Sequence, residues 1–204
     1  MGLTNVDLDR IDGSSGSIST ASINNIKNSA SVSNNIVLNS DGTTTLTPSN
    51  IIKSGTAAAS TSGTSIDFTG IPSWVKRITV MFNGVSTSGT SAVVIRLGTG
   101  STPTYTASGY LGTVGAVNFN TGFQLDDIGN AAGVRHGAGQ ILLLNPNTFI
   151  YSFTGSGGRS DSAGAQYAAG GSISLGAVAT AIRITTVNGT DAFDAGTINI
   201  LYEG

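Results

Sequence analysis

Alternation of apolar and polar residues along the last two thirds of the chain constrains its fold more than any other feature. The segments 78–82, 93–97, 149–153 and 198–202 each place an apolar side chain at every second position. A period of two is typical of β-strands that bury one face. The final stretch, IRITTVNGTDAFDAGTINILYE, contains two such runs joined by Asn, Gly, Thr and Asp, and this pattern predicts a β-hairpin.

Turn-forming residues recur about every ten residues between these runs, and strands do not alternate with helical patterns. The sequence therefore predicts an all-β fold, an antiparallel two-sheet sandwich of jelly-roll type with an extended N-terminal arm. An open barrel is the alternative. The candidate strands lie at 65–68, 77–83, 92–97, 104–111, 116–125, 139–144, 149–154, 171–175, 182–187 and 197–202.

Residues 1–60 differ from the rest, because no aromatic residue precedes Phe68 and short apolar groups are separated by Ser, Asn, Thr and Gly. Such a segment cannot bury a core of its own, so we expect an extended arm, followed by a sandwich domain at 61–204. A small hairpin is predicted inside the arm, with Asp41-Gly42 as its turn. The low-complexity stretch 53–64 is either a linker or an edge segment of the sandwich.

Charge is scarce: only 10% of residues are charged, compared with about 25% in an ordinary soluble domain. Weak charge repulsion between copies favours a homo-oligomer. With a net charge of -2 and no basic run, we expect no nucleic-acid partner. No apolar stretch approaches the roughly 20 residues of a membrane span, so membrane insertion is not expected.

One short segment breaks the alternation. Ile141, Leu142, Leu143 and Leu144 form an unbroken apolar run, which indicates a strand buried on both faces. The second face would lie against a neighbouring element or another copy of the chain. We therefore take these four residues as the candidate subunit interface.

The residues available for catalysis are few. Cysteine is absent, and the one histidine, His136 in GVRHGAG, has no serine in an elbow sequence near it, so it is interpreted as an exposed loop residue. The acidic groups Asp126-Asp127 and Asp191 with Asp194 fall in loops, where aspartates commonly bond their own backbone. We expect no catalytic residues, no metal site and no cofactor, and hence a protein that is not an enzyme.

The run from Gly155 to Gly171 is interpreted as a long loop able to bind a saccharide through hydrogen bonds. Its candidate glycan contacts are Arg159, Asp161, Gln166 and Tyr167. A passive connector is the simpler alternative. Trp74 could stack on a sugar, but a single tryptophan entering a strand favours a place in the core.

The segments TSIDFTGIPSWVKRITVMFNGVSTSGT (64–90) and 182–203 resemble a domain that recurs in tail-fibre and other virion structural proteins of tailed bacteriophages. The resemblance spans about residues 54–203, with residues 112–176 as the variable part. It implies a trimeric, β-rich virion appendage, assembled in the host cytoplasm, whose arm contacts other virion proteins. A capsid decoration (cement) or head-fibre protein, a module binding host surface glycan, and a depolymerase remain alternatives.

Overall fold

The computed structural model describes residues 52–126, 130–131, 133–161 and 165–204, and the backbone of three short strands before them. The chain forms two compact units, Met1–Ser49 and Asn50–Gly204. In the first unit, strands β1 (Asn25–Ile26), β2 (Ile36–Leu38) and β3 (Thr44–Leu46) form a small sheet in that order. β2 and β3 pair antiparallel, with Leu38 opposite Thr44, which confirms the hairpin predicted there; its turn lies outside the described residues.

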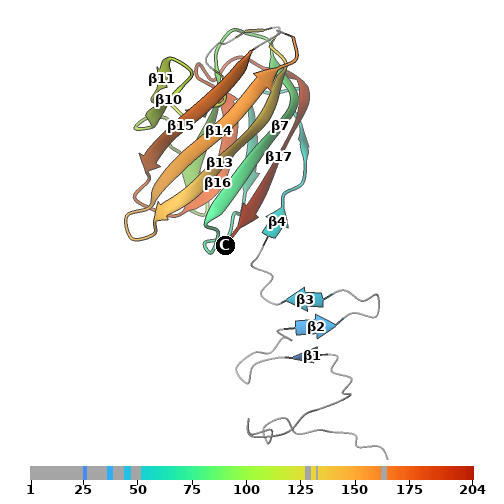
Figure 1. Ribbon diagram of the computed structural model, residues 1–204, viewed down its shortest axis with the longest axis vertical. Coiled ribbons are helices and arrows are strands. Elements are labelled where there is room, and N and C mark those ends of the chain that lie inside the picture. The colour runs from blue at the N-terminus through green and yellow to red at the C-terminus, as the bar shows by residue number, and fades with distance from the viewer. Residues whose placement is uncertain are drawn as a thin grey trace, which may run out of the picture. The chain divides into compact units, whose positions relative to one another are not determined.

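The second unit is a sandwich of two antiparallel sheets, which confirms the predicted fold class (Figure 1). The larger, nine-stranded sheet has the order β11-β10-β15-β14-β13-β7-β17-β4, with β5 also paired to β17. Its strands are β4 (Ile52–Ser54), β5 (Ala58–Ala59), β7 (Arg77–Thr87), β10 (Leu111–Val114), β11 (Val117–Phe119), β13 (Arg135–Asn145), β14 (Ile150–Arg159), β15 (Gln166–Ser174) and β17 (Phe193–Glu203). The jelly-roll description of this sandwich stays a prediction.

The smaller, five-stranded sheet has the order β12-β8-β16-β6, with β9 also paired to β8. Its strands are β6 (Ser65–Thr69), β8 (Val93–Thr99), β9 (Thr104–Tyr105), β12 (Phe123–Gln124) and β16 (Ala179–Thr186). Among the described residues, none belongs to a helix long and apolar enough to cross a membrane.

The core lies between the two sheets and is built from the alternating residues. Val80 and Ile200 of the larger sheet and Ile95 and Ile184 of the smaller are all buried. At the centre, the rings of Phe123 and Phe153 stack across the sandwich with centroids 4.5 Å apart. Burying such side chains is the main stabilising contribution, at about 25 cal/mol per Å² of apolar surface.

The predicted C-terminal hairpin is wrong, although both of its strands exist. β16 pairs with β6 and β8 in the smaller sheet, whereas β17 pairs with β7, β4 and β5 in the larger one. The connection 187–192 therefore crosses from one sheet to the other. Each strand buries one face against the opposite sheet, and a period of two is equally compatible with that arrangement.

The sandwich begins earlier than residue 61, which corrects the predicted domain boundary. β4 and β5 extend the larger sheet by pairing with β17, so the stretch 53–64 is an edge segment rather than a linker. Ser60 is fully buried and its hydroxyl donates to the carbonyl of Ala195 at 2.8 Å. Residues 52–60 thus belong to the sandwich and not to an arm.

The run 141–144 is apolar throughout but not buried throughout in the single chain. Ile141 is 1% exposed and Leu143 packs against the core, whereas Leu142 and Leu144 are 36% and 67% exposed. The inner face is covered by the other sheet, and the outer face has no cover from this chain's described residues. That this outer face contacts another subunit stays a prediction.

Candidate functional site

The candidate site lies at the glycine-rich ends of β13, β14 and β15. The run 155–171 is not a long loop: β14 continues to Arg159 and β15 starts at Gln166. Gly158 lies opposite His136 on β13 and opposite Gln166 on β15, so these residues form one row across the sheet. The sequence GSGGRS (155–160), which begins the run interpreted as a loop, is a strand for most of its length.

Glycine occurs in these strands because the inner face has no room for side chains there. A Cβ placed on Gly139 or Gly155 would lie 2.6 Å or 2.9 Å from the ring of Phe153, and on Gly155 also 2.5 Å from Leu125. A Cβ on Gly157 would lie 3.1 Å from the carbonyl oxygen of Leu125. The segment around Leu125 therefore packs directly on the backbone of β13 and β14.

A shallow, open groove of about 630 Å³ lies over this row. The residues that line it are His136, Gly137, Ser156, Gly157, Gly158, Gln166, Tyr167 and Ala168. Gly158 stands between His136 and Gln166 and has no side chain, so the two polar side chains flank a gap above the backbone. The amide of Gln166 is exposed and can both donate and accept, so the groove offers hydrogen bonds to a neutral polar ligand.

His136 is a strand residue, which corrects its interpretation as a loop residue. The N–H of Gly84 donates to its Nδ1 at 3.3 Å, and its Nε2 lies 3.2 Å from Oγ of Ser160. A backbone N–H can only donate, so in the neutral ring Nδ1 accepts and Nε2 carries the hydrogen. A nucleophilic serine needs the opposite tautomer, with Nε2 accepting the hydroxyl proton. This Ser–His pair is therefore arranged for structure rather than for attack on a substrate.

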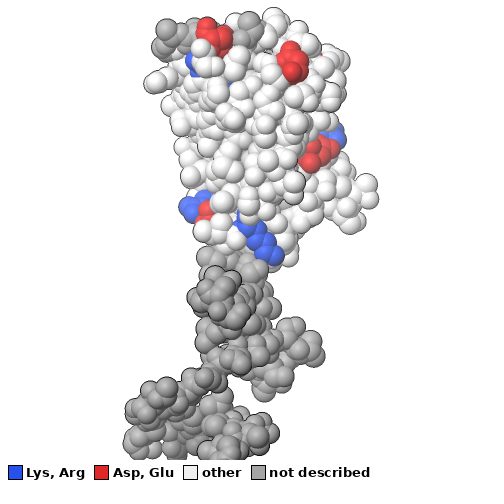
Figure 2. Space-filling view, turned by 90° about the vertical axis from the view of Figure 1, so that its right-hand side faces the viewer, with Lys and Arg blue, Asp and Glu red and all other residues white. Residues whose placement is uncertain are grey.

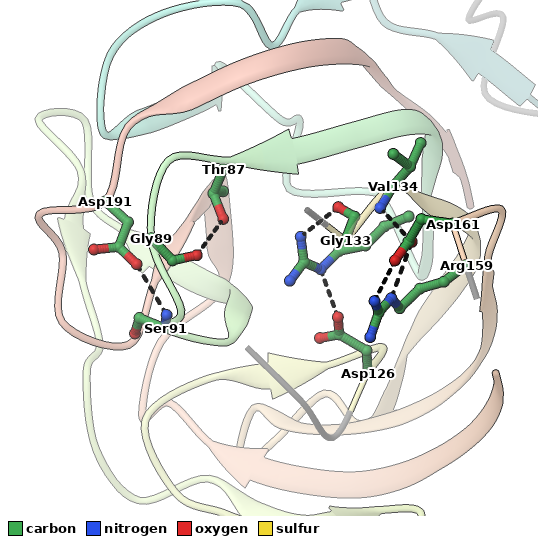
Figure 3. A network of polar contacts seen from close by, with 10 residues as sticks. Thr87, Gly89, Ser91, Asp126, Gly133, Val134, Arg159, Asp161 and Asp191 are labelled. Atoms are coloured by element: carbon green, nitrogen blue, oxygen red, sulfur yellow. Dashed lines mark hydrogen bonds and ion pairs between the residues drawn. The ribbon is translucent and has the colours of Figure 1, made fainter. Parts of the chain in front are cut away.

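Arg159, the last residue of β14, bonds to Asp161 (Figure 3). Oδ1 of Asp161 accepts from Nε of Arg159 at 3.1 Å and from the N–H of Val134 at 2.8 Å, and Oδ2 accepts from Nη2 of Arg159. The hydrogen bond from Arg159, followed by that from Val134, lowers the pKa of Asp161 below its ordinary value. The hydrogen bond to Asp161 in turn raises the pKa of Arg159.

The four candidate glycan contacts therefore lie together, but only two of them line the groove. Arg159 and Asp161 neutralise each other and fix the hairpin end. Gln166 is exposed, whereas Tyr167 is half-buried and packs against the core. His136, the opposite wall, was not predicted as a site residue, because the glycines around it in GVRHGAG indicated a loop.

The carboxylates considered for acid–base chemistry are already engaged. Asp126 is 3% exposed and accepts a hydrogen bond from Nε of the buried Arg135 at 2.5 Å (Figure 3). Asp191 accepts from the N–H of Ser91 at 2.9 Å and from the side chain of Asn188 at 2.7 Å, and these bonds lower its pKa. Each carboxylate thus bonds a residue of another segment of the sandwich, and Asp127 lies outside the described residues.

Asp194 and Trp74 also have structural partners. Asp194 accepts a hydrogen bond from the hydroxyl of Ser86. Trp74 packs against the core and its ring lies 6.0 Å from that of Tyr202, in line with the expected core position. Within the part of the chain that the structure describes, no three His, Cys, Asp or Glu side chains gather as a metal site.

No family model, curated protein or solved structure matches the chain.

Proposed function

We propose that this protein is a non-enzymatic structural protein of a tailed-bacteriophage virion. It forms a trimeric fibre or tail appendage, with the N-terminal unit contacting other virion proteins and the sandwich projecting outward to contact the host surface. A capsid decoration or head-fibre role uses the same parts and differs in where the protein lies on the particle.

One observation carries this proposal: the two segments that resemble virion proteins pair with each other in both sheets. β6, from the first segment, pairs with β16, from the second, with Ile66 opposite Ile184. β7 pairs with β17 in the other sheet, with Val80 opposite Ile200. The resemblance therefore covers one continuous structural unit, which supports a common scaffold.

The variable part of the resemblance forms a different region. Residues 112–176 include β13, β14 and β15 and hence the groove beside His136 and Gln166. A scaffold held constant by its ends, with a variable middle that forms an open surface, suits a protein that is displayed on a particle. The internal bonding of Asp126 and Asp191 favours a non-enzymatic role over that of a depolymerase.

Incorporation into particles tests the proposal. Particles purified from a phage lysate of the source strain would be probed with an antibody raised against residues 50–204. We expect the protein to sediment with particles, and a chain that starts at Asn50 to fold but not to sediment with them. A protein that stays in the supernatant in its full-length form would contradict the proposal.

The groove favours one second function, a module that binds host surface glycan. The groove is lined by no Asp, Glu, Lys or Arg side chain and contains the exposed amide of Gln166, which suits the hydroxyl groups of a neutral saccharide.

Two substitutions test this function. Gly158→Val would place a side chain in the gap, and Gln166→Ala would remove one wall. Both are expected to abolish binding on a glycan array, while the control Thr69→Val on the smaller sheet retains it. Equal binding by all three variants, or no binding by the unmodified protein, would exclude this function.

A further inference from the structure

The outer face of the nine-stranded sheet is almost free of charge. Its middle row crosses six neighbouring strands through Thr113, Gly170, Thr154, Gln140, Thr79 and Leu201. The next row contains Ala168, Ser156, Ala138, Met81 and Asn199. Alternate residues of the same strands, such as Phe153 and Val80, are buried in the core, so these rows point away from it. We call the two rows the neutral face.

The row on the other side of the middle row adds apolar side chains. Leu111 and Ile52 stand at its two ends and are 69% and 56% exposed, with Leu142 between them. Its two charged residues, Arg77 and Glu203, are paired with each other. The whole surface therefore carries no uncompensated charge. The side of the sandwich with β17 and β4 likewise shows only scattered charged residues (Figure 2).

The outer face of the smaller sheet, in contrast, carries charged side chains. On the smaller sheet, Arg183 lies opposite Asp67 on one side and Arg96 on the other. Arg183 donates to both carboxylate oxygens of Asp67, at 2.8 Å and 2.7 Å, and its guanidinium lies 4.1 Å from the ring of Tyr105. Charged side chains thus lie on the outer face of the smaller sheet, whereas the neutral face has none.

We infer that the neutral face is the contact surface between copies of this chain. The inference rests on the proposed function, because it names the subunit contact that an oligomeric appendage requires. A nucleic acid or an anionic surface needs cations, which the neutral face lacks. A second copy needs no complementary charge and meets no like charge there.

The area and the shape of this surface also favour a second copy of the chain. The neutral face together with the apolar row beside it, three rows at about 6.8 Å along six strands at about 4.8 Å spacing, spans roughly 600 Å². A standard protein–protein contact buries about 800 Å² on each partner, so the surface is of the right order without its flanks. Small side chains such as Ala138, Ser156 and Ala168 allow another chain to approach the sheet closely.

The absence of cysteine from the chain makes a direct test possible, because one introduced thiol reports on one position. Thr154→Cys would place it on the neutral face, and Thr69→Cys at an exposed threonine of the smaller sheet. Both changes put a small side chain at an exposed position, and circular dichroism checks that each full-length variant folds. Ser156→Cys replaces Thr154→Cys if the latter does not fold.

Labelling rates with a maleimide would be measured at a concentration where light scattering gives the mass of the oligomer. We expect Thr154→Cys to react at least about tenfold more slowly than Thr69→Cys, since only the dissociated fraction exposes the face. Equal rates, or the mass of a single copy, would overturn the inference. An oligomer with a protected face that is absent from particles would instead overturn the proposed function alone.

Discussion

The hydroxyl of Tyr151 accepts a hydrogen bond 2.9 Å long from the backbone N–H of Ala179, and this bond joins the two sheets. Tyr151 lies on β14 of the larger sheet, and Ala179 begins β16 of the smaller one. The pairing of β16 with β8 shifts register directly after Ala179. The tyrosine thus provides a partner where the ladder is irregular, inside a core where an unpaired N–H is costly.

Tyr151→Phe is predicted to destabilise the sandwich by about 1–3 kcal/mol, because it leaves the buried N–H of Ala179 without an acceptor. Chemical denaturation followed by fluorescence measures the change. Tyr202→Phe is the matched control: Tyr202 is half-buried and packs through its ring against Trp74. A change of equal size in both variants would mean that the bond to Ala179 contributes nothing specific.

Stability should fall at alkaline pH because of Tyr110. Its hydroxyl is buried and accepts from the N–H of Leu97 at 2.8 Å, and burial raises its pKa from 10.0 to about 12. The folded chain therefore holds this proton more tightly than the unfolded chain does. The protonated hydroxyl therefore contributes fully to the free energy of unfolding below about pH 10, and this contribution is lost as the pH rises towards 12. The loss amounts to about 1.4 kcal/mol for each unit by which the folded and unfolded pKa values differ.

Urea unfolding between pH 8 and pH 12 measures that loss. Tyr110→Phe removes the titrating group, so its free energy of unfolding should fall less steeply with pH in this window, even though the variant is less stable at pH 8. Identical slopes in the two proteins would show that Tyr110 is not the group responsible.

Much of this fold could be predicted from the sequence, but the pairing of its strands could not. Alternation located strands such as β7, β8 and β17 within a few residues, because burial of one face imposes a period of two. The same period says nothing about which sheet a strand joins, so β16 and β17 were wrongly joined as a hairpin. Local turn residues are common to hairpins and to connections between sheets.

The candidate site was predicted only in part for a similar reason. Gly139 and Gly155 have no side chain because Leu125 and Phe153 occupy the space, yet glycine in a sequence indicates a turn more often than a close approach. His136 follows Arg135 at a point where the pairing with β7 shifts register. This register shift depends on the partner strand β7, so the sequence around His136 shows no periodic pattern that would predict it.

The buried ion pair between Asp126 and Arg135 offers another test. The two side chains are 4% and 6% exposed, so Asp126→Ala would leave a buried guanidinium without its carboxylate. We predict a loss of about 3–5 kcal/mol in unfolding free energy. The exposed pair of Arg183 and Asp67 is the control, and Asp67→Ala should cost no more than about 1 kcal/mol. Similar costs for the two changes would contradict the burial of Asp126.

Gly196 occupies a bulge in the antiparallel pairing of β17 with β7, and its φ is +96°. A Cβ there would lie 2.4 Å from the carbonyl oxygen of Gly84, which is backbone and cannot move aside. Gly196→Ala should therefore cost about 3 kcal/mol or more, from strain and overlap together. Gly189 has a φ of +72° in open space, so Gly189→Ala isolates the strain alone, at about 1–2 kcal/mol. Equal losses of stability in thermal unfolding would contradict the close approach of the β7 and β17 backbones at this bulge.

Electron microscopy of an intact particle from the source strain tests the central claim most directly. The account predicts projecting density that fits the two-sheet sandwich, repeated in groups of three around an axis, with the neutral face turned towards a neighbouring copy. Particles that form normally and contain no such density, in a strain shown to make the protein, would contradict it.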